Sequence, residues 1–182
     1  MKNLLNEAIV YLAGPIECVK DFGVGWRDDF IMKSDHLNLD IINPCNKPSN
    51  CTAEVGRSGE RTVDRLRRQR KWSELQRFVK GFRREDLRFT DLADFLILYI
   101  NPSIHMCGSY DEAFNAERQK KPLFAICEGG IEKLPTWLFG VFSTNEVFDN
   151  VDQCIAHLEK LNDGRIELDD RWVLIRKYLA EM

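Results

Sequence analysis

Apolar residues follow two patterns along this chain: short unbroken runs, and longer stretches in which they recur at helical spacing. The unbroken runs are rich in β-branched and aromatic residues and are bounded by Gly, Pro, Asn or Asp, so they predict buried strands. The spaced positions predict amphipathic helices. Strands are predicted at residues 8–13, 39–42, 95–100, 122–127 and, more briefly, 146–148. Helices are predicted at residues 24–37, 61–82, 87–92, 109–119, 150–161 and 168–180.

The alternation of these strands and helices favours an α/β fold, in which helices cover both faces of a parallel sheet. No internal repeat, low-complexity tract or linker divides residues 1–182, so a single domain is predicted. Residues 46–60 are polar and contain glycine, which favours a mobile loop. Asp86 stands directly before the helix at 87–92 and is predicted to be its N-cap.

Charge is spread unevenly along the chain. The net charge of -3 over 182 residues is too small to indicate a nucleic-acid partner, so no nucleic acid polymer is expected. Between Arg57 and Arg88, however, twelve Lys or Arg stand against five Asp or Glu, a local charge of +7 that leaves -10 for the remainder. Two interpretations of this basic stretch remain open: a surface that meets phosphate, and a solvated helix face.

Neither a signal-peptide pattern nor an apolar run approaching the roughly 20 residues of a membrane span is present in the sequence. A cytoplasmic protein without a membrane partner is therefore expected. The six cysteines are scattered, with no CxxC pair and no paired histidines, so free thiols are expected and a structural zinc site is not.

Two residues are the strongest candidates for chemistry. Tyr11 lies near the end of the first strand, in IVYLAGPI, and Glu112 lies in CGSYDEAFNAE, where a helix is predicted to begin. Ligands in open α/β sheets bind at the carboxyl ends of the strands, and Gly14 lets the backbone approach such a ligand closely. A carboxylate in such a place, oriented by a phenol, suits covalent catalysis at a sugar carbon.

Four segments of the chain together resemble the nucleoside 2-deoxyribosyltransferase family. They are YLAGP from Tyr11, the Asp86-Leu87 step, ADFLILYINP at 93–102, and Gly108-Ser109-Tyr110-Asp111-Glu112 followed by Ala116. The resemblance spans roughly residues 9–150, with a basic loop and helical insertion at about 46–82. It implies a flavodoxin-like fold and cleavage of the glycosidic bond of a 2′-deoxynucleoside, with transfer of the sugar to another base.

The resemblance also implies roles for individual residues. Glu112 would be the nucleophile, Tyr11 would position it, and Asp86 would move the proton of the base. Asp94 would support the site near the base pocket. Expected substrate-binding residues are Gly14, Pro15, Ile16, Trp26, Arg27, Met106, Gly108 and Ser109. Neither a metal nor a cofactor is implied.

Met106 departs from the family pattern. Members that act on nucleosides carry an aspartate six residues before the catalytic glutamate, where it meets the 5′-hydroxyl of the sugar. Relatives that hydrolyse deoxynucleoside 5′-monophosphates lack that aspartate, because a carboxylate would repel the phosphate. Ser109, Lys20, Arg27 and the basic stretch would then serve a 5′-phosphate. A monophosphate N-glycosidase is therefore the first alternative function.

The second alternative is a catalytically silent module that binds nucleotides or a partner protein. In that interpretation Glu112 is stabilised by the dipole of its helix, Asp86 is only a cap, and Tyr11 is ordinary core. The family also implies a homo-oligomer whose neighbouring subunit completes the site. Trp137 and Phe139, in LPTWLFG, would suit a subunit interface or a base-stacking lid, or else a buried short helix.

Overall fold

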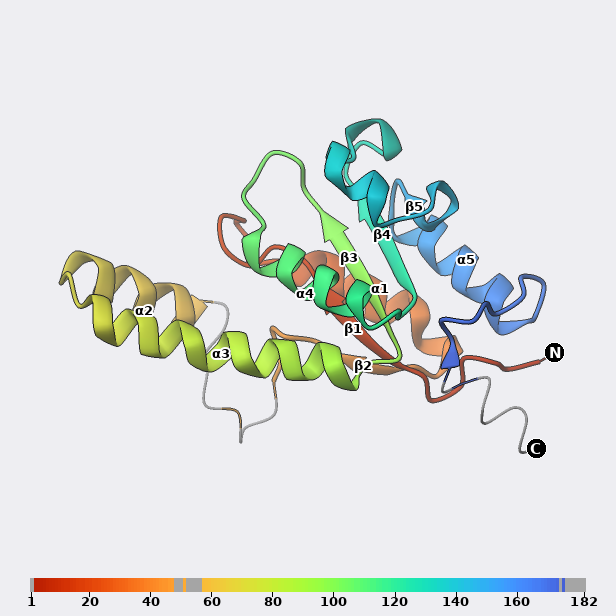
Figure 1. Cartoon of the computed structure of the whole chain (residues 1–182), viewed down its shortest axis with the longest axis horizontal. Helices are drawn as coiled ribbons and strands as arrows, with labels where there is room; N and C mark the ends of the chain where they lie inside the picture. Colours follow the sequence, from red (N-terminus) through yellow and green to blue (C-terminus); the bar gives the residue numbers. More distant parts are fainter. Residues whose placement is uncertain (1, 48–50, 52–56, 174, 176–182) are drawn as a thin grey trace.

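A single sheet of parallel strands forms the centre of the molecule (Figure 1). The computed structural model describes residues 2–47, 51, 57–173 and 175, without the side chains of 57, 58 and 60. The strands are β1 (Ile9–Ala13), β2 (Asp40–Ile42), β3 (Phe95–Ile100), β4 (Leu123–Cys127) and β5 (Val147–Phe148). Their order is β2-β1-β3-β4-β5 and every neighbouring pair is parallel, which is the flavodoxin-like order. The predicted α/β fold class is confirmed.

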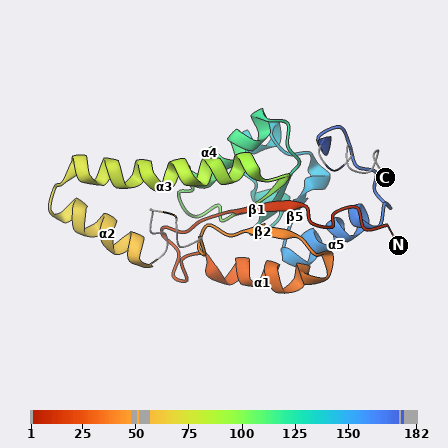
Figure 2. The same cartoon turned by 90° about the horizontal axis from the view of Figure 1, so that it is seen from below.

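Helices cover both faces of this sheet (Figure 2). They are α1 (Val24–Ser34), α2 (Arg57–Arg68), α3 (Trp72–Leu92), α4 (Cys107–Arg118) and α5 (Val151–Asn162). One face carries α1 and α5, and the other carries α3 and α4. Successive residues of β1 point to opposite faces, so Val10 and Leu12 join the core under α1 and α5, whereas Tyr11 and Ala13 join the core under α4. The alternation of side chains along β1 therefore places Tyr11 on the face of the sheet that α4 covers.

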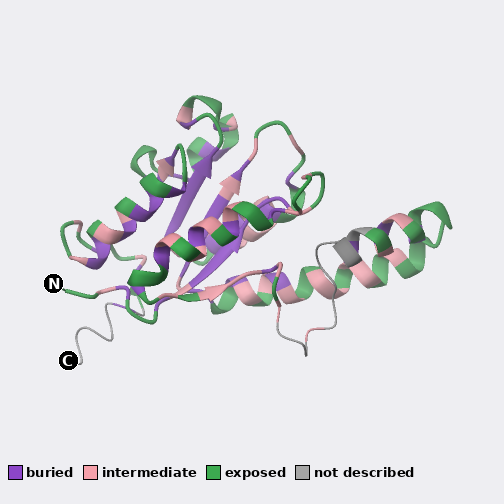
Figure 3. Ribbon diagram, turned by 180° about the vertical axis from the view of Figure 1, so that it is seen from behind, coloured by how far each residue is buried: buried purple, intermediate pink, exposed green. Residues whose placement is uncertain are grey.

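The basic region forms a helical hairpin that extends away from the sheet (Figures 1 and 3). One helix was predicted at 61–82, but the chain breaks at Arg70, which has a left-handed φ of 54° and turns α2 back onto α3. The predicted N-cap at Asp86 is wrong, since Asp86 lies inside α3. An apolar stripe that includes Leu75, Phe82 and Phe89 continues across that position, so the helix does not end there.

Two other predicted segments differ from the structure. α4 begins at Cys107, so Glu112 occupies the second helical turn rather than the first, where the helix dipole acts most strongly. The predicted loop at 46–60 is wrong at residues 57–60, which belong to α2, and the predicted helix at 168–180 is wrong at residues 168–172, which are not helical. The remainder of both segments lies largely outside the described residues. Within the described part of the chain, no helix is long and apolar enough to cross a membrane.

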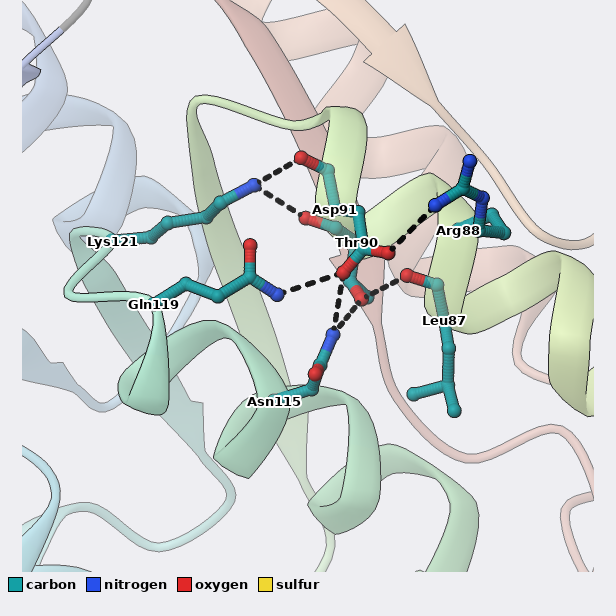
Figure 4. A network of polar contacts seen from close by, with 7 residues as sticks. All are labelled: Leu87, Arg88, Thr90, Asp91, Asn115, Gln119 and Lys121. Carbon is teal, nitrogen blue, oxygen red and sulfur yellow. Dashed lines mark hydrogen bonds and ion pairs between the residues drawn. The ribbon is translucent and has the colours of Figure 1, made fainter.

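Lys121 closes the C-terminal end of α3. Its half-buried Nζ donates hydrogen bonds to the carbonyl groups of Thr90 and Asp91, in the last turn of that helix (Figure 4). It also donates to the carbonyl group of Ala93, the residue that follows the helix. Helix ends leave such carbonyls without intrahelical partners, and a cation there also complements the negative end of the helix dipole. Lys121 lies three residues after the end of α4, so this contact fixes the end of α3 beside the end of α4.

Side chains of α4 reinforce the same junction. Asn115 donates to Thr90 Oγ1 at 2.8 Å and to Asp91 Oδ1 at 3.0 Å, and Gln119 donates to the same Asp91 oxygen at 2.7 Å (Figure 4). Thr90 in turn donates to the carbonyl of Leu87 at 2.7 Å. These bonds set the position of α3 on α4 one helical turn beyond Asp86.

We expect Lys121→Met to lower the free energy of unfolding by about 2 kcal/mol, because it leaves the carbonyls at the end of α3 without their charged donor. Urea denaturation measures the change. Lys120→Met is the matched control, since Lys120 is exposed and adjacent. Equal stability of the two variants would contradict a structural role for the Lys121 contacts.

Candidate functional site

A hydrogen bond joins the two residues that the sequence singled out. The Tyr11 hydroxyl donates to Glu112 Oε1 at 2.9 Å, across the interface between β1 and α4. Tyr11 is fully buried, whereas part of the Glu112 side chain remains accessible to solvent. A phenol that donates to one carboxylate oxygen fixes the orientation of the carboxyl group and leaves its second oxygen for other contacts.

The environment of Glu112 favours its protonated form. Burial, reinforced by the negative charge of Asp86, raises the pKa of Glu112 to about 8. The hydrogen bond from Tyr11 and the nearby cations act in the opposite direction. Burial and the charge of Glu112 also raise the pKa of Tyr11 well above its ordinary value, so the phenol remains a donor at neutral pH.

Asp86 is the second carboxyl of this site, and α3 carries it there. The residue is buried, and that burial raises the pKa of Asp86. Two nearby, poorly solvated carboxyls ionise together only at an electrostatic cost. Glu112 has the larger upward shift of its pKa, so it is the carboxyl of the two that favours its protonated form near neutral pH.

A lysine that sequence reasoning missed completes this cluster. Lys47 Nζ lies 2.6 Å from Asp86 Oδ1 and 3.7 Å from Glu85 Oε2, and only 6% of the Lys47 side chain is exposed. Its contact with Asp86 opposes the effect of burial on the pKa of that carboxyl. No sequence pattern marks Lys47, because it lies in the irregular segment after β2.

Arg27 holds the turn that follows β1. Its fully buried guanidinium donates to the carbonyl groups of Leu12 at 3.2 Å, Gly14 at 2.9 Å and Gly23 at 2.7 Å. A weaker contact of 3.5 Å reaches the carbonyl of Pro15. The N–H groups of Arg27, which were expected to bind a substrate, are therefore already bonded to backbone carbonyls. Arg27 affects the site by fixing the backbone of this turn.

Aromatic rings pack tightly against the same turn. The rings of Trp26 and Tyr99 stack with centroids 4.9 Å apart, and a Cβ on Gly14 would come within 2.7 Å of the Trp26 ring. Any residue larger than glycine at position 14 would therefore displace the ring. Trp26 Nε1 is buried and has no hydrogen-bond partner among the residues that the structure describes. The Tyr99 hydroxyl donates to Glu128 Oε1 at 3.1 Å.

Asp94 does not join this cluster. Its carboxylate accepts a hydrogen bond from the backbone N–H of Ile9 at 2.8 Å, and its own N–H donates to the carbonyl of Ile9 at 2.7 Å. Both contacts lie where β1 and β3 begin, whereas Tyr11 lies further along β1. Asp94 therefore lies at the amino-terminal ends of the strands, and its supporting role stays a prediction.

The other predicted binding residues lie around the starts of α1 and α4. Met106 is buried, and its Sδ accepts a hydrogen bond from the N–H of Asn101 at 3.3 Å. Ser109 is buried within α4, whereas Gly108 is exposed. Pro15 is buried and Ile16 half-buried in the turn after β1. An apolar side chain thus stands where nucleoside-active members of the resembled family have a carboxylate.

Trp137 and Phe139 lie in a short 3-10 helix, Thr136–Gly140, and both are exposed, Trp137 to 81%. The interpretation as a buried short helix is therefore wrong for these two side chains, while Leu138 between them is buried.

Over the described part of the chain, no group of three or more His, Cys, Asp or Glu is placed to hold a metal ion. All six cysteines are free thiols, as expected.

Comparison of the chain with protein-family models gives no match, and comparison with curated proteins gives none either. The chemistry of the site therefore has to be argued from its own geometry. Two nearby carboxyls, one of them oriented by a phenol, can supply a nucleophile and a general acid in the same cycle.

We expect Glu112→Gln to stabilise the fold increasingly as pH rises. The pKa of Glu112 rises from 4.5 to about 8 on folding, so the folded state binds more protons between these pH values, and wild-type stability falls as pH rises through that window. Each pKa unit corresponds to about 1.4 kcal/mol. Glutamine has no charge, so it avoids the cost of ionising a buried carboxyl at high pH.

Urea denaturation at pH 4.5, 6 and 8 measures the difference between the variant and the wild type. Glu132→Gln is the control, because Glu132 is exposed in a short helix away from this cluster. A stability difference that stays constant with pH would show that Glu112 does not hold its proton in the folded state.

Proposed function

We propose that this chain breaks the N-glycosidic bond of a 2′-deoxynucleoside or deoxynucleotide and transfers the sugar to another base, as a nucleoside 2-deoxyribosyltransferase does. The observation that carries the proposal is the Tyr11 hydrogen bond to Glu112 beside the second buried carboxyl, Asp86. This arrangement agrees with the roles that the family resemblance implies for these three residues.

In the proposed first step, one oxygen of the ionised Glu112 attacks the anomeric carbon of the sugar. The bond between that carbon and the base nitrogen breaks, and the base leaves with its bonding electrons and a proton from Asp86. A glutamyl-deoxyribose ester results. In the second step another base attacks the same carbon, Asp86 takes up its proton, and the Glu112 carboxylate is released.

The proposed sequence needs a change of protonation before its first step. The pKa of Glu112 favours the protonated form of this residue near neutral pH, whereas the first step needs Glu112 ionised and Asp86 protonated. A proton must therefore move from Glu112 to Asp86, directly or through solvent, when the reaction begins. Tyr11 stabilises the ionised Glu112 that this transfer produces, because its hydroxyl donates to the carboxylate.

A deoxynucleoside 5′-monophosphate N-glycosidase, in which water replaces the acceptor base, is the second candidate. The observation that favours it is the buried, apolar Met106 at the start of α4. The basic hairpin supports it less. Its distal part extends away from the sheet (Figure 1), and several of its cations already pair with carboxylates, including Arg83 with Asp111 at 2.6 Å.

A silent binding module is the least supported candidate. A buried carboxyl pair with raised pKa values destabilises a fold, and such pairs are concentrated at catalytic sites. We also infer a homo-oligomer, in which the exposed Trp137 and Phe139 meet a second subunit or close over the base.

We expect Glu112→Ala to lower turnover by several powers of ten with little change in folding, because it removes the attacking group. Release of free base, followed by chromatography, measures turnover. The matched control is Glu117→Gln, which changes another glutamate of α4. A well-folded Glu112→Ala protein with normal turnover would contradict the proposed mechanism.

The same assay separates the candidate functions when deoxynucleosides and their 5′-monophosphates are supplied with and without a second free base. Formation of a new nucleoside or nucleotide supports the transferase. Release of deoxyribose 5-phosphate that does not depend on an acceptor base supports the hydrolase. Binding without any base release supports the silent module.

We expect Asp86→Asn to slow natural substrates by about 10²–10⁴-fold, because their bases leave only when protonated. A substrate whose leaving group needs no proton should be affected far less. Steady-state rates for both substrates measure the difference. Equal losses on the two substrates would show that Asp86 acts in binding or in structure instead.

A further inference from the structure

Lys47 is the one buried cation near the carboxyl pair, among the described residues, whose contacts are with carboxylates rather than backbone. Its ammonium lies 2.6 Å from Asp86 Oδ1, and its side chain is 6% exposed. Arg27, the other buried cation nearby, donates to backbone carbonyls. Lys47 therefore supplies the positive charge that contacts the carboxylate of Asp86. Neither the sequence patterns nor the resemblance assigns Lys47 a role.

The contact between Lys47 and Asp86 also joins two segments that lie far apart in the sequence. Lys47 precedes the excursion that contains α2 and most of α3, and Asp86 lies where α3 returns to the sheet. The ion pair thus joins the two ends of the excursion at its base. Because the junction of α3 with α4 is fixed one turn further on by Thr90 and Asp91, the Lys47 contact determines the charge around an Asp86 that is already held in place.

We propose that Lys47 acts through Asp86 in the proposed reaction: its buried ammonium, paired with that carboxylate, sets the pH range in which Asp86 and Glu112 gain and lose their protons. The inference rests on the proposed function only for its effect on turnover. Its effect on the carboxyl pair follows from the ion pair itself.

The direction of the effect follows from the charged groups around the pair. They come from every element packed there: Tyr11 of β1, Arg27 of α1, Glu85 and Asp86 of α3, Glu112 of α4, and Cys45 and Lys47 of the segment after β2. A cation at hydrogen-bond distance favours the ionised form of a carboxyl. Without Lys47, both proton losses of the pair should therefore move to higher pH.

The test compares Lys47→Met with wild type by carboxyl ¹³C NMR of selectively labelled Asp and Glu across pH 4–10. We expect the titration midpoints of the pair to rise by about 1–2 pH units in Lys47→Met, and to stay near wild type in Lys47→Arg. Lys80→Met is the matched control, since it removes the same charge from the exposed side of α3. Unchanged midpoints in Lys47→Met would overturn the inference.

Turnover supplies the second readout. The whole pH profile of kcat/KM should move upward by the same amount in Lys47→Met and return in Lys47→Arg. A purely structural role would instead lower the rate at every pH and leave the profile where it is. Lack of turnover in the wild type would overturn the proposed function alone, because the NMR midpoints do not depend on any substrate.

A third measurement needs no variant and covers the case in which Lys47→Met does not fold. In the wild-type protein, the ¹⁵Nζ resonance of Lys47 should shift at the same pH values at which the carboxyl pair titrates. A resonance that does not respond to either titration would overturn the inference, since it would show that the ammonium does not sense the charge of Asp86.

Discussion

The electrostatic repulsion between the carboxyl groups of Glu112 and Asp86 is the constraint that the rest of this site must accommodate. Glu112 and Asp86 come from different helices, and each ionises less readily because of its burial. A fold keeps such a pair only if other contacts hold the two helices together against the repulsion. The hydrogen bonds at the end of α3, from Lys121, Asn115 and Gln119, provide that support one turn away.

The two buried cations of the site, Arg27 and Lys47, contact different kinds of group. Arg27 donates to the carbonyl groups around the turn after β1, so it fixes backbone. Lys47 contacts carboxylates directly, so it changes charge. This division resembles the general distinction between the two residue types, because a guanidinium presents several donors in a rigid plane and an ammonium acts as a compact point charge.

Under the proposed function, stability and catalysis make opposite demands on this site. A glutamate whose pKa is raised to about 8 lowers the stability of the folded state at neutral pH. The same property keeps a proton available within the carboxyl pair. Stabilising the pair by removing a charge would therefore remove the feature that makes it useful for proton transfer.

The sequence by itself determined the fold class and the candidate pair Tyr11 and Glu112. Unbroken apolar runs are local signals, so the strands appear close to their predicted positions. The period-two geometry of β1 and the location of ligand sites at the carboxyl ends of strands were enough to direct attention to these two residues.

Only the tertiary structure decided the rest of the site. Asp86 looked like a helix cap, because its place inside α3 depends on packing that continues beyond any local signal. The contacts of Asp94 with Ile9 place it at the amino-terminal ends of β1 and β3, which its position before an apolar run does not reveal. Lys47 carried no signal at all, since its partner Asp86 is distant in sequence and an ion pair formed by chain return leaves no periodic pattern.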